Sequence, residues 1–121
     1  MLHHIAVPVP TGLLGACRAF YATLGFSEVP PPDSLAGRAV WLQRGRTQVH
    51  LMIVADDEGA KPSAGHLAVV APDYERTVRA LRAAGHEVDA RRAHWGAARA
   101  FVLDPAGHRV EIMAYPPGVG S

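Results

Sequence analysis

The chain has 121 residues with a formal net charge of +1, and 49% of its residues are hydrophobic. This length suits one domain with a real core, and the near-zero charge argues against a nucleic acid or a strongly acidic partner. A single cysteine, Cys17, excludes an internal disulfide framework, and neither a membrane span nor a signal-peptide pattern is found. We therefore expect a soluble, cytoplasmic protein.

The first half of the chain predicts one helix and four strands. The strands are expected at residues 2–9, 26–29, 38–43 and 48–53. Between the first two strands, apolar residues recur at helical spacing from Thr11, a plausible N-cap, to Gly25, which ends the helix. The proline-rich stretch at 30–34 predicts a stiff connector that cannot pair as an inner strand. This half therefore reads β-α-β-β-β.

The second half repeats that order. Its strands are expected at residues 66–70, 87–90, 98–103 and 109–114. A helix begins at Pro72-Asp73 and ends at Gly85, and the Asp104–Gly107 stretch has the residues of a tight turn. We expect one domain over 1–121, and we divide it into a module at about 1–54, a linker at about 55–63, a second module at about 64–115 and a loose tail at 116–121.

Four segments match across the two halves at nearly the same offset, which indicates two copies of one unit of roughly 60 residues. Val49-His50-Leu51-Met52 matches Val110-Glu111-Ile112-Met113, and His4-Ile5-Ala6-Val7 matches His66-Leu67-Ala68-Val69. Leu24-Gly25-Phe26 matches Ala84-Gly85-His86, and Arg38-Ala39-Val40-Trp41 matches Arg99-Ala100-Phe101-Val102. The fold class predicted from this pattern is α+β, with two βαβββ modules.

Alternation along the strands separates an apolar face from a polar one. The residues expected on the apolar, helix-covered face are Ile5, Val7, Val49, Leu51, Ile53, Leu67, Val69, Val110 and Ile112. His4, His50, His66 and Glu111 are expected together on the opposite face, whereas His3 is expected to point away from His4. A slip of one residue would exchange the two faces, so the register is well specified.

Three imidazoles and one carboxylate at equivalent positions predict a site for a divalent transition metal. Fe, Mn, Ni, Co and Zn are all admissible for His4, His50, His66 and Glu111, whereas Ca and Mg are disfavoured. Each residue also has an ordinary structural alternative. His4 or His66 could be hydrogen-bonded within the sheet, and His50 could be a cross-strand partner. Glu111 could form a salt bridge with Arg99 or Arg109.

The chain resembles the vicinal oxygen chelate superfamily, which includes glyoxalases, bleomycin-resistance proteins and extradiol dioxygenases. The resemblance covers nearly the whole chain. The segments that carry it are Leu2-His3-His4-Ile5-Ala6-Val7, Phe20-Tyr21-Ala22-Thr23-Leu24-Gly25-Phe26, Gly65-His66-Leu67-Ala68-Val69 and the ending Phe101-Val102-Leu103-Asp104-Pro105-Ala106-Gly107-His108-Arg109-Val110-Glu111. It implies that the two modules form a curved mixed sheet whose cup holds a metal at the four positions named above.

The resemblance also implies a chemistry. A metal in the cup would chelate neighbouring oxygens of a small oxygenated substrate, and Glu111 or His50 would move the proton in a lyase or isomerase reaction. Dioxygenation remains open, because extradiol enzymes use two His and one Glu, matching His4, His66 and Glu111. Glyoxalase I carries Glu or Gln where this chain has His50, a difference that argues against glutathione-hemithioacetal isomerisation.

A second hypothesis from another class is a metal-free binding protein that sequesters a drug or another hydrophobic ligand, as bleomycin-resistance proteins do. Trp41, Met52, Trp95 and Met113 would then form the ligand or substrate pocket, although these residue types equally suit core packing. A homodimer is expected, because cups of this family are commonly completed by a partner chain and sheet edges need covering.

Overall fold

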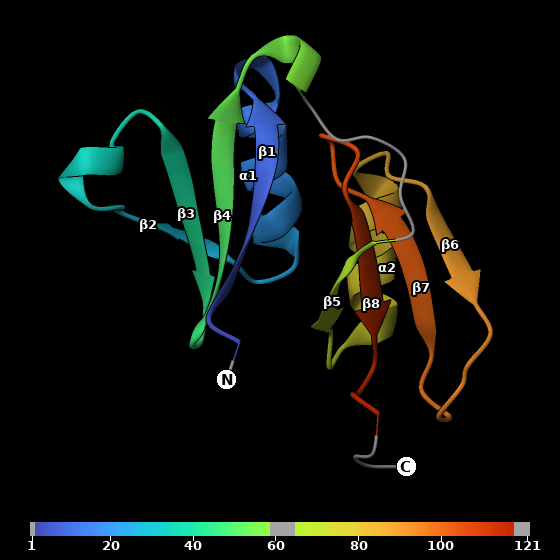
Figure 1. Cartoon of the computed structure of the whole chain (residues 1–121). Helices are drawn as coiled ribbons and strands as arrows, with labels where there is room; N and C mark the ends of the chain where they lie inside the picture. Colours follow the sequence, from blue (N-terminus) through green and yellow to red (C-terminus); the bar gives the residue numbers. More distant parts are fainter. Residues whose placement is uncertain (1, 59–64, 118–121) are drawn as a thin grey trace. The chain divides into compact units, whose positions relative to one another are not determined.

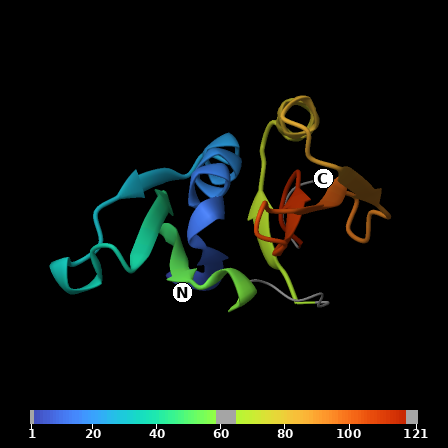
Figure 2. The same ribbon diagram turned by 90° about the horizontal axis from the view of Figure 1, so that it is seen from above.

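The computed structural model describes residues 2–58 and 65–117. These residues fall into two compact units, Met1–Pro62 with Pro105–His108, and Ser63–Asp104 with Arg109–Ser121. Each unit has one four-stranded mixed sheet with a helix against one of its faces, as Figures 1 and 2 show for each unit separately. The predicted α+β architecture of two βαβββ modules is therefore confirmed.

The first unit has the strand order β1-β4-β3-β2. Its strands are β1 (His4–Pro10), β2 (Ser27–Val29), β3 (Ala39–Arg44) and β4 (Thr47–Val54). Strand β1 runs parallel to β4, and the other neighbours are antiparallel. Helix α1 (Leu14–Thr23) packs behind β1 and β4 in Figure 1. It buries an apolar stripe of Leu14, Cys17, Phe20 and Tyr21.

The second unit repeats this topology with the order β5-β8-β7-β6. Its strands are β5 (Leu67–Val70), β6 (Val88–Arg91), β7 (Arg99–Leu103) and β8 (Arg109–Met113), with β5 parallel to β8. Helix α2 (Tyr74–Ala83) buries Val78 and Leu81. Its start at Asp73 is confirmed, because that side chain accepts a hydrogen bond from the backbone N–H of Arg76 at 3.4 Å.

The start of the first helix differs from the prediction. Thr11 does not cap α1, because residues Thr11–Leu13 form a separate 3-10 turn, η1, and α1 begins at Leu14 without a side-chain cap. Pro10 immediately before η1 fixes the backbone that enters this turn. Two further 3-10 turns, η2 (Asp33–Leu35) and η3 (Asp56–Glu58), lie in the proline-rich connector and in the predicted linker.

The match that places Arg38–Trp41 on Arg99–Val102 is wrong by one residue. Trp41 pairs with His50 across β3 and β4, and Phe101 pairs with Glu111 across β7 and β8. Trp41 therefore corresponds to Phe101, at an offset of 60. The physical reason is the longer turn before β8. Phe101 precedes its strand partner Glu111 by ten positions, whereas Trp41 precedes its partner His50 by nine.

The core lies between each sheet and its helix, as the alternation predicts. Val49 and Leu51 on β4 are 2% and 0% exposed, and Val110 and Ile112 on β8 are both fully buried. The parallel strands β1 and β5 are less completely covered, with Ile5, Leu67 and Val69 half-buried. The remaining parts of the predicted linker and tail, residues 59–63 and 118–121, lie outside the described residues.

Candidate active site

In the first unit, three rings are stacked on the sheet face that points away from α1. His50 lies between Trp41, with ring centroids 4.1 Å apart and planes parallel, and His4, with centroids 4.0 Å apart and planes 17° from parallel. The pairing of Trp41 with His50 in the antiparallel ladder brings the first two rings together. The structure therefore brings two of the four predicted ligands, His4 and His50, into contact.

His50 is held by a chain of amide side chains and is buried. Its Nε2 lies 2.7 Å from Oε1 of Gln48, whose Nε2 donates to Oε1 of Gln43 at 2.8 Å. Because an amide oxygen only accepts, this chain assigns the proton of His50 to Nε2. Burial, followed by repulsion from His4 and His3, lowers the pKa of His50 below its usual 6.5. His50 is therefore a neutral imidazole at neutral pH.

His3 does not point away from His4 as the alternation predicts. The Nδ1 atoms of His3 and His4 lie 3.0 Å apart, and the two rings meet edge to face. Strand β1 begins only at His4, so the two-residue period of a strand does not apply to His3. His4 itself is exposed, unlike His50.

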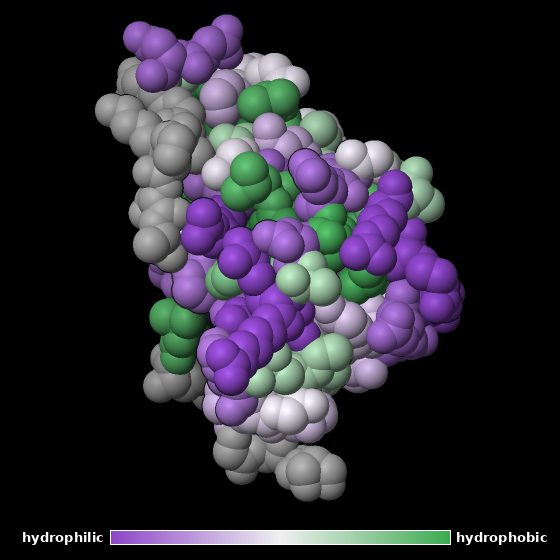
Figure 3. All heavy atoms as spheres, turned by 90° about the vertical axis from the view of Figure 1, so that its right-hand side faces the viewer, coloured by the Kyte–Doolittle hydropathy of each residue, from purple (hydrophilic) through white to green (hydrophobic). Residues whose placement is uncertain are grey.

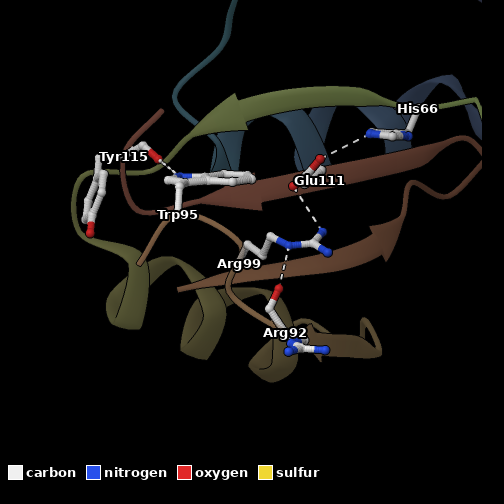
Figure 4. Close-up of polar contacts among 6 residues, drawn as sticks. All are labelled: His66, Arg92, Trp95, Arg99, Glu111 and Tyr115. Carbon is white, nitrogen blue, oxygen red and sulfur yellow. Dashed lines mark hydrogen bonds and ion pairs between the residues drawn. The ribbon is translucent and has the colours of Figure 1, made fainter. Parts of the chain in front are cut away.

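In the second unit, Glu111 is the centre of a charged network. It is 7% exposed in the middle of β8, and it binds two groups, one with each carboxylate oxygen (Figure 4). His66 Nε2 lies 3.1 Å from Oε1, and Arg99 donates from Nη1 to Oε2 at 3.2 Å. The structure thus brings the other two predicted ligands, His66 and Glu111, into contact, and it adds the salt bridge to Arg99 that the sequence left as an alternative.

The loop between β6 and β7 is tied to this network. Arg99 donates from Nε to the carbonyl oxygen of Arg92 at 2.9 Å, so one guanidinium holds both the loop and Glu111 (Figure 4). Trp95 in the same loop donates from Nε1 to the carbonyl oxygen of Tyr115 at 2.9 Å. The side chain of Trp95 is therefore fixed against the segment that follows β8.

The two pairs of predicted ligands differ in how they suit a metal ion. Two donor atoms that share a transition metal at about 2.1 Å lie roughly 3.0–3.5 Å apart, so the 3.1 Å between His66 and Glu111 fits. The stacked rings of His4 and His50 do not fit in this arrangement, because in-plane lone pairs of nearly parallel rings do not converge on one ion. Taken singly, neither unit's described residues gather three or more His, Cys, Asp or Glu into a group that could hold a metal.

The four predicted pocket residues lie in different surroundings. Trp41 is part of the ring stack, and its buried Nε1 finds no hydrogen-bond partner among the described residues. Met52 on β4 is 38% exposed, whereas Met113 on β8 is buried. Trp95 contacts Tyr115 as described above. These positions are consistent with both a pocket and ordinary packing.

A hollow of about 460 Å³ in the second unit is lined by other residues. Its lining is Glu87, Val88, Asp89, Arg91, Phe101, Val102, Leu103 and Arg109, from β6, β7 and β8 with their flanks. The side of this unit shown in Figure 3 carries hydrophilic side chains interleaved with small hydrophobic areas. Sequence reasoning missed this hollow, because the offset of 61 between the two repeats aligned Phe101 with Val40 instead of Trp41. Alternation within β7, which sets Phe101 on the face of Arg99, could have found it.

The comparisons with known proteins agree with this architecture. The family model of the Glyoxalase/Bleomycin resistance protein/Dioxygenase superfamily matches residues 1–112. The chain belongs to this superfamily. No curated protein matches the sequence. Within the described residues, no helix is both long and apolar enough to cross a membrane.

Solved structures show the same fold. A glyoxalase family protein from Bacillus anthracis is 29% identical, with a TM-score of 0.80 and 93% of each chain covered. A lactoylglutathione lyase from Agrobacterium tumefaciens is 21% identical, with a TM-score of 0.66 over 93% of this chain and 92% of the other. The oxidase ChaP-H2 is 23% identical, with a TM-score of 0.72 over 100% and 98%. At such identities the last two show the fold alone, and they illustrate how varied the chemistry on it is.

Proposed function

We propose that the protein is a divalent-metal-dependent enzyme that acts on a small oxygenated substrate by proton transfer, in a reaction of the lyase or isomerase type. One observation carries the proposal: Glu111 is a buried carboxylate with a histidine donor atom 3.1 Å from its Oε1. A carboxylate is costly to bury in mid-strand, and the arrangement with His66 has the spacing that a shared first-row metal requires. The superfamily includes lyases and oxygenases, which supports an enzymatic role.

In this proposal His66 and Glu111 hold the metal. His4 is a further ligand that the sequence repeat predicts. The candidate metals are Fe, Mn, Ni, Co and Zn. When bound, the metal would act as a Lewis acid toward the substrate oxygens. Arg99 donates a hydrogen bond to Oε2 of Glu111, whereas Oε1 is directed to His66. Oε1 is therefore the oxygen that would bind the metal.

His50 is assigned the movement of a proton rather than a ligand role. Its stacking on His4 keeps the two rings from sharing an ion, and its lowered pKa keeps it neutral. A neutral imidazole with Nε2–H directed to Gln48 has Nδ1 as the atom that can accept a proton. The second carboxylate oxygen of Glu111 accepts a hydrogen bond from Arg99.

The test is elemental analysis of the purified protein, prepared without chelators, for each candidate metal. We expect near-stoichiometric metal in the natural protein and its loss in His66→Ala and Glu111→Gln. His94→Ala is the matched control, because His94 is an exposed histidine of the same unit. Unchanged metal content in His66→Ala and Glu111→Gln, or no metal after reconstitution, would overturn the proposal.

A metal-free binding protein is the second candidate, and the charge of Arg99 favours it. Arg99 is 12% exposed in its side chain and already neutralises Glu111, so the carboxylate is satisfied without a metal. The lining of the 460 Å³ hollow in the second unit combines apolar and charged groups, as ligand sites do. Saturable binding of a drug-like ligand by EDTA-treated protein, without turnover, would favour this candidate.

The protein is also proposed to be a homodimer. The edge strands of the two described sheets, β2 and β6 among them, present unpaired backbone groups that a partner chain could cover. Sedimentation velocity at micromolar concentration tests this directly. A single species with the mass of one 12.9 kDa chain would contradict it.

A further inference from the structure

Three arginines surround one phenylalanine in the second unit. The guanidinium carbons of Arg91, Arg99 and Arg109 lie 5.3, 5.6 and 5.3 Å from the centroid of the Phe101 ring. They come from three adjacent strands, β6, β7 and β8, whose register places them around the ring. Three like charges at one ring repel one another, so each needs compensation beyond the cation–π attraction.

Two of these arginines have a carboxylate partner, whereas the third has none among the residues that the structure describes. Arg99 binds Glu111, and Arg91 binds Asp89 at 2.8 Å. Over residues 2–58 and 65–117, Arg109 makes no ion pair; its contact is the face of the Phe101 ring. A cation–π contact does not use the N–H donors of a guanidinium, so those of Arg109 can bind a planar, bidentate acceptor.

Arg109 and Phe101 both line the 460 Å³ hollow, a volume within the range of sites for small molecules. Phe101, Leu103 and the valines of the lining supply apolar contact. Leu103 is a large hydrophobic side chain that is 55% exposed, which leaves it open to a ligand. The carboxylates of Glu87 and Asp89 also lie in the lining, and they repel an anion with two or more negative charges more strongly than a monoanion.

We propose that this hollow binds a small monocarboxylate with an apolar, preferably aromatic, body. Arg109 receives the carboxylate in a bidentate ion pair, and the body of the ligand packs beside Phe101 and Leu103. As a statement about the substrate class, the inference rests on the proposed function. Binding of the monocarboxylate itself requires no metal, so the binding proposal and the metal proposal can fail separately.

The experiment is a titration of EDTA-treated, full-length protein with benzoate, followed by two-dimensional amide NMR. Benzamide is the matched neutral probe, since it has the same shape without the charge. We expect saturable shifts for residues of β6, β7 and β8 with benzoate, and at least about tenfold weaker binding of benzamide, from the loss of a charge-assisted pair.

Two variants locate the effect. Arg109→Gln is expected to weaken benzoate binding by about tenfold or more, whereas Arg91→Gln, which removes an arginine already paired with Asp89, should change it less than about threefold. The NMR spectrum of each variant reports whether it is folded, and Phe101→Leu provides a second test that keeps every charge. Phosphate at matched ionic strength should not displace benzoate.

The proposal is overturned by equal binding of benzamide and benzoate, by unchanged binding in folded Arg109→Gln, or by displacement with phosphate, which would indicate a general anion site. If Arg109→Gln is unfolded, unchanged benzoate affinity in Phe101→Leu also overturns the proposal. Metal content measured on each preparation before the EDTA treatment separates this result from the metal proposal: normal metal without later benzoate binding refutes only the ligand assignment.

Discussion

The same backbone carries different chemistry in the two units. His50 and Glu111 occupy equivalent positions, since each lies between an alanine of the parallel strand and an aromatic residue of the antiparallel one. In the first unit the neighbours are rings, and His50 is stacked between Trp41 and His4. In the second unit the partners are polar side chains, and Glu111 is held by the His66 ring and the Arg99 guanidinium.

This difference shows how a duplicated unit can specialise without changing its fold. Both central residues are nearly buried, at 6% and 7% exposure, so each needs a partner for its polar atoms. A neutral imidazole is satisfied by one amide oxygen and by stacking, whereas a carboxylate requires cations or a metal. The fold supplies the position, and the side chain at that position decides what must surround it.

The largest effect is expected from breaking the charged pair of the second unit. Arg99→Met leaves the buried Glu111 carboxylate without its cation, and we expect a loss of about 3 kcal/mol in the free energy of unfolding. Urea denaturation measures it. The double variant Arg99→Met/Glu111→Leu should recover most of this loss, because no unpaired charge then remains. A loss below about 1 kcal/mol in the single variant would show that the pair is effectively solvated.

The ring stack of the first unit should respond to size rather than charge. Trp41→Ala removes the ring on one side of His50 and should cost about 2 kcal/mol of unfolding free energy. Trp41→Phe keeps a ring and removes the buried Nε1 that lacks a partner, so its cost should stay below about 1 kcal/mol. If both variants lose equally, the indole itself, not the stacking of a ring, stabilises this unit.

A pH dependence of stability is expected from His50, the central residue of the first unit. The pKa of His50 is lowered in the folded state, so the unfolded chain takes up its proton first as the pH falls below 6.5. Stability is therefore complete above pH 6.5 and decreases below it, until the folded state is also protonated. We expect His50→Gln to lose less stability than the natural protein between pH 7.5 and 5.5, as measured by urea denaturation. If the unfolding free energies of the natural protein and of His50→Gln change in parallel with pH, His50 is not the source of this pH dependence.

Exposed ion pairs should give the smallest effect, and equally in both units. Arg18 and Glu28 are 2.7 Å apart in the first unit but 44% and 50% exposed, and Arg91–Asp89 is the comparable pair of the second. Arg18→Gln and Arg91→Gln should each change the free energy of unfolding by less than about 0.5 kcal/mol. A larger change in unfolding free energy for one variant would show that its ion pair belongs to a charged network, and that the pair of the other unit does not.

Much of the fold was available from the sequence because its signals are local. Alternation in Val49–Ile53 and Val110–Met113 specifies which side chains face the core, and one helix per half follows from spacing that ends at Gly25 and Gly85. Gly25, Gly85 and Gly107 all adopt positive φ, as their predicted places after a helix or in a turn require. The repeat then placed His50 and Glu111 at equivalent positions.

The partners of those residues were decided only by the tertiary structure. Arg99 and Arg109 were equally plausible partners of Glu111 by sequence, and the structure pairs Glu111 with Arg99 while Arg109 lies over the Phe101 ring. The stacking of His50, and the extra residue before β8 that realigned Phe101 with Trp41, were equally out of reach. Alternation determines the face on which a side chain lies, but its contacts depend on strand register and on the directions of long side chains, which no local pattern encodes.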